Sequence, residues 1–122
     1  MKYMLLTYLD EHAWAARTEE DREQAMDAAR PHVLNLLAAG KFLGGAPLSP
    51  TSTASTVKLS GGKRVITDGP FAETREQLGG YTLIEASSDE EAIEIASGFL
   101  GSRSPATIEI RQILEIPGIP TH

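Results

Sequence analysis

The chain has 122 residues, of which 41% are hydrophobic and 23% are charged, and its formal net charge is −6. This length allows one compact domain with a core and is too short for two. The acidic balance and the scattered basic residues argue against nucleic acid and anionic membranes as partners, because both require Lys and Arg. The chain has no cysteine, which excludes disulfides, thiol catalysis and cysteine-based metal sites.

Residues 2–9 are rich in aromatic and aliphatic side chains, and this pattern predicts a buried strand. The same apolar run is too short for a signal peptide or a membrane span, so we expect a cytoplasmic protein. Residues 10–17 are expected to form a connection that contains the only tryptophan, Trp14.

A helix is predicted to begin after the cap residue Thr18 and to end near Ala39. Thr18 is followed by three acidic residues, which the helix dipole favours in a first turn. Pro31 is expected to kink or split this helix because it removes a backbone hydrogen bond. Gly40 is typical of a helix end, and residues 41–48 predict a second strand.

A β-hairpin is predicted next, because Gly61 and Gly62 separate two short strand-like runs, residues 56–60 and 63–67.

The second half of the chain then repeats the pattern of strand, helix and strand. Residues 81–86 predict a strand, and Ser88 begins a capping box that opens a helix. Residues 102–106 predict a loop, and residues 107–116 predict the last strand.

This order predicts an α+β fold of the ferredoxin-like kind, in which two helices cover one face of an antiparallel sheet. Residues 1–117 are predicted to be one domain and residues 118–122 a C-terminal tail. The other sheet face is expected to carry apolar side chains such as Tyr3, Leu5 and Leu83 or their neighbours. An uncovered apolar face is unfavourable in a monomer, so we predict a homodimer whose sheets face each other in a barrel-like core.

Residues 68–81, D-G-P-F-A-E-T-R-E-Q-L-G-G-Y, are the most informative stretch of the chain. Pro70 after Gly69 predicts a fixed turn. Gly79 and Gly80 predict backbone angles or close approaches that a side chain would forbid. Because the stretch also holds three carboxylates, it predicts a shaped candidate site.

The chain resembles the YCII-related superfamily, in the branch named for its Asp-Gly-Pro-Phe motif. The matching segments are residues 1–6, Gly40 with Gly44 and Gly45, residues 48–50, residues 68–81 and residues 108–111. The resemblance covers nearly the whole chain and implies a dimeric α/β barrel of ferredoxin-like units with no obligatory cofactor. Relatives in the superfamily include an enzyme that removes chloride from a hydroxylated aromatic, and some branch members are attached to sigma factors.

The wider superfamily pairs a helix histidine with an Asp-Pro sequence in the C-terminal half. By resemblance, His32 matches the histidine, whereas Ser104 and Pro105 stand at the Asp-Pro position. Either Asp68 replaces the missing acid, or His32 has no catalytic partner.

His32 and Asp68 are the candidate catalytic residues. A histidine is the natural proton carrier near neutral pH, but His32 is also placed where a structural, partly buried histidine would lie. Asp68 can orient His32, act as a base itself, or cap the turn that it enters.

The candidate substrate-binding residues are Phe71, Glu76, Tyr81 and Arg111. Phe71 is expected to belong to the core, whereas Tyr81 belongs either to the core or to a ligand pocket. Glu76 would either pair with Glu73, since a spacing of three puts both on one face of a helical turn, or tie down the loop near Arg75 and Gly80.

Arg111 has two readings, because it is a polar residue in an otherwise apolar strand. It would either bind a substrate carboxylate or pair with Glu109 or Glu85. A metal held by His32, Asp68 and Glu76 has no supporting spacing, and no phosphate-loop motif is present, so no cofactor is predicted.

Two functions follow from these residues. The first is a cofactor-free lyase or isomerase that transfers a proton on a small organic molecule, with His32 as acid or base and Asp68 as its orienter or as the second base. The alternative is a non-catalytic module that binds a small-molecule ligand or a regulatory partner. The sequence does not identify the ligand in either case.

Overall fold

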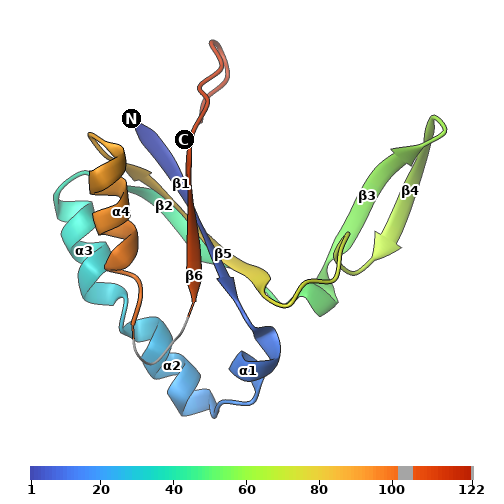
Figure 1. Cartoon of the computed structure of the whole chain (residues 1–122), viewed down its shortest axis with the longest axis horizontal. Coiled ribbons are helices and arrows are strands. Elements are labelled where there is room, and N and C mark those ends of the chain that lie inside the picture. The colour runs from blue at the N-terminus through green and yellow to red at the C-terminus, as the bar shows by residue number, and fades with distance from the viewer. Residues whose placement is uncertain (102–105, 122) are drawn as a thin grey trace.

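The computed structural model describes residues 1–101 and 106–121 and has one main sheet covered by helices on one face (Figure 1). The strand order of this antiparallel sheet is β2-β5-β1-β6, which is compatible with the predicted ferredoxin-like fold. Its strands are β1 (Lys2–Leu9), β2 (Phe42–Pro47), β5 (Gln77–Glu85) and β6 (Thr107–Gln112). The helices are α1 (Glu11–Ala15), α2 (Glu19–Asp27), α3 (Arg30–Ala38) and α4 (Asp89–Ser97), with a 3-10 turn η1 (Thr51–Thr53).

The predicted hairpin is confirmed, but it is not part of the main sheet. Strands β3 (Ser55–Ser60) and β4 (Lys63–Asp68) pair with each other in a separate two-stranded sheet. Figure 1 shows this hairpin standing away from the helices and the main sheet. Gly61 and Gly62 form its turn with φ angles of 56° and 78°, which is why glycines occupy both positions.

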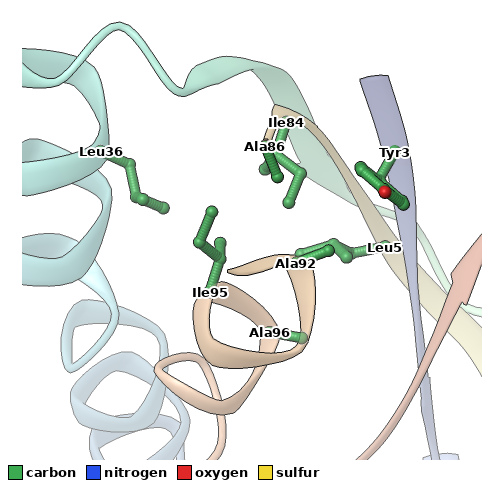
Figure 2. Packing of buried hydrophobic residues seen from close by; sticks show 8 residues of the cluster. All are labelled: Tyr3, Leu5, Leu36, Ile84, Ala86, Ala92, Ile95 and Ala96. Carbon is green, nitrogen blue, oxygen red and sulfur yellow. The ribbon is translucent and has the colours of Figure 1, made fainter. Parts of the chain in front are cut away.

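The core lies between the main sheet and helices α3 and α4 (Figure 2). Tyr3, Leu5 and Ile84 on the sheet face Leu36 of α3 and the apolar face of α4. Burying such side chains is the main favourable term in folding. The expectation that Tyr3 and Leu5 lie on the uncovered face is therefore wrong.

The uncovered face of the sheet carries the neighbours of these residues instead. Met4 and Leu6 alternate with Tyr3 and Leu5 along β1, and Met4 is paired in register with Leu83 of β5. Side chains that are directly opposite in an antiparallel pair share one face. Three apolar side chains thus lie together on the face without helices.

The long predicted helix is split where Pro31 stands, as expected. Helix α2 ends at Asp27, and α3 begins at Arg30 with Pro31 in its first turn. Backbone N–H groups in a first turn have no acceptor within the helix, so proline is tolerated there. Thr18 caps α2 by accepting a hydrogen bond from the Asp21 backbone. Helix α1 was predicted as a connection; it forms because Asp10 accepts hydrogen bonds from the backbones of His12 and Ala13.

The two ends of the second half differ from the predicted bounds. Strand β5 begins at Gln77 rather than residue 81, because Gln77, Leu78 and Gly80 pair with β1. Gly79 has no register partner and lies at the irregularity in this pairing. Strand β6 ends at Gln112 rather than residue 116. Within the described part of the chain, no helix has the length and apolar character needed to cross a bilayer.

Candidate functional site

A cavity of about 600 Å³ lies between helices α1 to α3 and one end of the main sheet. Its walls are mostly apolar, and they include Trp14, Met26, Val33, Phe42, Leu48 and Tyr81. Thr7, Ser49 and Thr82 add hydroxyl groups. Glu11 and Tyr81 are the titratable side chains among the described lining residues. An apolar pocket with a few polar groups is the usual form of a small-molecule site.

Small residues leave the space that forms this cavity. Ala25 and Ala29 line its helical side, where the chain passes from α2 to α3. Gly45 and Gly80 line its strand side. A Cβ on Gly45 would lie 2.7 Å from the Tyr81 carbonyl oxygen, and one on Gly80 would lie 3.2 Å from that of Ala46. Glycine is therefore required at Gly45 by the close approach of β2 to β5.

Glu11 is fixed by its hydrogen bonds at the rim of the cavity. Its Oε1 accepts a hydrogen bond from the Thr51 backbone at 2.9 Å, and its Oε2 accepts one from the Thr51 hydroxyl at 2.7 Å. The Glu11 backbone donates to Oε1 of Gln77 at 2.9 Å. The carboxylate therefore joins α1 to η1, and both of its oxygens already have partners.

Trp14 is the largest aromatic side chain in the cavity wall. The Arg17 guanidinium carbon lies 5.5 Å from the centre of its ring, within the range of a cation–π interaction. Arg17 is in turn held by Asp21, with 3.2 Å between Nε and Oδ2. These contacts fix the indole against the start of α2, so the cavity has a preformed aromatic wall.

His32 joins the two core helices. Its Nε2 donates a hydrogen bond to the Ile95 carbonyl oxygen of α4 at 2.8 Å. Its ring meets Phe99 edge to face, with centroids 4.6 Å apart. A Cβ on Gly98 would overlap the imidazole. The ring is half-buried and does not line the cavity within the described part of the chain. These contacts fit the reading of His32 as a structural, partly buried histidine.

Asp68 lies at the end of β4, opposite Ser55 in the hairpin register, and its side chain is exposed. Figure 1 shows the hairpin and helix α3 at opposite ends of the molecule. One chain therefore does not bring His32 and Asp68 into hydrogen-bond reach of each other, as acid–base cooperation requires. Ser104 and Pro105, the positions matched to the family's Asp-Pro, lie outside the described residues.

The turn that follows Asp68 is fixed by the hairpin. Gly69 has a φ of 94°, its backbone N–H donates to the Ala54 carbonyl oxygen at 2.7 Å, and its own carbonyl accepts from the Thr56 hydroxyl at 2.8 Å. The positive φ explains why a glycine stands there. The turn is shaped, as predicted, but the bonds that shape it hold the base of the hairpin.

The side chains of residues 70–76, between this turn and β5, are exposed. Phe71 is 91% exposed, so the expectation that it belongs to the core is wrong. Residues 70–76 form bends rather than a helical turn, so Glu73 and Glu76 do not share a helix face. Both side chains are exposed. The pairing of these two acids, which a helical turn would have brought about, therefore does not occur.

The other two candidate binding residues lie on the main sheet. Tyr81 of β5 lines the cavity and is 40% exposed. Arg111 of β6 is exposed, and its Nη1 lies 3.5 Å from Oε2 of Glu109, one of the pairings considered for it. No group of three metal-ligating side chains occurs among the described residues, and His32, Asp68 and Glu76 do not converge.

Several cavity residues were not singled out from the sequence. Met26 and Val33 lie in the predicted helix, and Leu48 is the last residue of the predicted second strand, directly after β2. The available signal was Trp14, because a single tryptophan in a connection is a large apolar residue where little packing is expected.

The chain is similar to known proteins over most of its length. The family model for the YCII-related domain matches residues 1–117. An uncharacterized protein of Rhizobium meliloti (strain 1021), R00369, is 38% identical over 107 residues, which cover 88% of this chain and 86% of the relative.

Proposed function

The chain belongs to the YCII-related family, and from this premise we propose that it binds a small, largely apolar organic molecule in the cavity beside Trp14. The observation that carries the proposal is the combination of volume and lining. A cavity of about 600 Å³ falls within the range of small-molecule sites. Aromatic side chains from Trp14, Phe42 and Phe99 favour a ligand with an aromatic ring.

The arrangement supports binding better than proton transfer. The Glu11 carboxylate accepts hydrogen bonds from Thr51, and the His32 ring donates one to the Ile95 carbonyl oxygen. A general base must reach the proton that it removes, directly or through one water. Asp68 on the hairpin is exposed and lies far from α3. The non-catalytic alternative therefore accounts for more of the geometry than the lyase or isomerase does.

We also propose that the chain works as a homodimer and belongs to the Asp-Gly-Pro-Phe branch of the family. Support for the dimer comes from Met4 and Leu6, which are only half-buried and lie on the sheet face without helices, beside Leu83, which is 7% exposed in the single chain. Covering such a face with a second copy would bury apolar area that is otherwise left in water. Support for the branch comes from the motif that runs from Asp68 to Phe71.

Trp14 provides a direct test of ligand binding, because it is the only tryptophan and lies in the cavity wall. A panel of small aromatic and aliphatic molecules, with and without a carboxylate, would be titrated while Trp14 fluorescence is recorded. We expect saturable changes for compounds with an aromatic ring. Calorimetry on the same compounds would supply the stoichiometry of one per chain.

Neighbouring substitutions on α3 locate the site. Val33 lines the cavity, whereas Leu34 is 56% exposed and points elsewhere. Val33→Phe should fill the space and weaken binding by about tenfold or more, since lost contact area in a pocket costs on that scale. Leu34→Phe should leave binding unchanged. Equal binding by the two variants, or no binding by any compound to the unaltered chain, would refute the proposal.

A further inference from the structure

The hairpin formed by residues 55–68 is a projecting arm, and we call it the arm. It forms its own two-stranded sheet and stands clear of the core (Figure 1). An isolated two-stranded hairpin is only marginally stable in water. An arm that is built with regular pairing from Ser55 to Asp68 therefore needs a surface against which to pack.

One face of the arm carries three large apolar side chains, with Arg64 beside them. Val57 is paired with Ile66, and Leu59 lies two residues further along the same strand, so the three side chains share a face. Their exposed fractions are 62%, 57% and 77%. The opposite face carries Lys58 paired with Val65. Val65 on that face is 36% exposed. A cluster of three large apolar side chains in water on one face is typical of an interaction surface.

The charge of the arm is opposite to that of the rest of the chain. Residues 55–68 hold three cations, Lys58, Lys63 and Arg64, and one acid, Asp68, for a net charge of +2. The whole chain carries −6, so the remaining residues carry −8. Acidic residues crowd the first turns of α2 and α4. The arm thus complements the surface of its own chain, which favours another copy as the partner.

We propose that the arm docks, through the face that carries Val57, Leu59 and Ile66, on a second copy of this chain. The arm would be exposed whenever the chain is folded, and a second copy is the one partner that is always present in equal amount. Charge points the same way, because a chain of net charge −6 repels polyanions. The inference rests on the homodimer of the proposed function and is independent of the ligand.

Hydrogen exchange tests the proposal when it is combined with light scattering at several protein concentrations. Docking should protect the backbone amides of β3 and β4 where the chain is dimeric, and the protection should disappear on dilution to the monomer. The expected slowing is about a hundredfold or more relative to an unprotected peptide, because opening then requires release of the partner. Higher salt should weaken association, since the arm and the body have opposite charges.

A matched pair of variants identifies the docking face. Thr retains strand propensity, so Val57→Thr with Ile66→Thr removes apolar area and leaves the hairpin pattern intact. This variant should weaken dimerisation roughly tenfold or more. Val65→Thr on the opposite face should change it less than about twofold. Equal effects of the two variants would overturn the assignment of the face.

Other outcomes separate this inference from the proposed function. A dimer whose arm amides exchange at unprotected rates would overturn the docking of the arm and leave the homodimer intact. A chain that stays monomeric at every concentration would overturn both the arm and the homodimer, while Trp14 titration would still report on the ligand. Protection that appears only after addition of a polyanion such as heparin would show that the partner is not a second copy.

Discussion

The helix-covered sheet and the projecting arm are built from the same kind of antiparallel pairing but are stabilised differently. In the main sheet, Tyr3 and Ile84 are paired in register and are 2% and 0% exposed beneath α4. In the arm, Val57 and Ile66 are also paired in register but are 62% and 57% exposed. Alternation of apolar residues therefore establishes a strand, whereas a second layer decides whether that strand is independently stable.

The largest expected effect separates the two regions directly. Ile84→Ala would remove a fully buried side chain and should lower the free energy of unfolding by about 2–5 kcal/mol. Ile66→Ala changes an exposed side chain and should cost about 0.5 kcal/mol or less in a dilute, monomeric sample. Urea denaturation of both variants at one low concentration makes the measurement. Similar losses would mean that the arm packs on its own chain.

A smaller effect is expected where α3 meets α4. Gly98→Ala would place a methyl group on the His32 ring and should cost about 1–3 kcal/mol, because tightly packed sites respond to added volume. His32→Ala should remove the overlap, so the double variant should lose less stability than the sum of the two single variants. Additive losses would show that the ring is not the cause. Gly101→Ala, which meets open space, is the control.

Alkaline titration probes the centre of the main sheet. The hydrogen bond from the Tyr3 hydroxyl to Oδ1 of Asp89, 2.7 Å long, together with burial, raises the pKa of Tyr3 to about 12. The neutral phenol is favoured in the folded state, so its contribution to stability is full below pH about 10 and is lost as the pH rises through about 12. Ultraviolet titration should show a step near pH 12, which Tyr3→Phe removes. A Tyr3→Phe chain that keeps this step would contradict the assignment.

The smallest effect is expected at the start of α4. A hydrogen bond from the Ser87 backbone, with help from Lys41 at 3.3 Å, holds the pKa of Glu91 below its ordinary value. The carboxylate therefore adds stability above the unfolded pKa of about 4.3, and this contribution is lost as the pH falls through the lower folded value. Glu91→Gln should flatten the acid side of the stability curve slightly. Glu94→Gln on the same helix serves as the control.

Much of the fold could be predicted because local signals agree with it. Thr18 and Ser88 cap their helices, Pro31 divides one helix into two, and Gly61 with Gly62 turns the hairpin. Each is a short-range effect of backbone geometry or of one hydrogen bond. The face occupied by Tyr3 could not be read in the same way, because alternation along β1 gives two apolar rows and only tertiary packing chooses between them.

The candidate site was harder to predict than the fold. The sequence directed attention to the acidic stretch, where an unusual density of glycine, proline and acids marks a shaped turn. That turn holds the base of the arm through Gly69. The cavity depends instead on small residues such as Ala25 and Ala29 that leave space between elements distant in the sequence. No sequence motif marks a space that small side chains leave empty. Among the candidate site residues, Tyr81 is the one that also lines the cavity.

The hydrogen bond from Gly69 to Ala54 closes the arm at its base, so the chain leaves the body and returns to it at adjacent points. A segment attached in this way can be replaced as a unit. A short linker between residues 54 and 69 would join two points of the chain that already lie side by side. Changes in the length of this segment are thus uncoupled from folding of the rest of the chain. The arm can therefore vary in length and sequence while the residues that line the cavity are retained.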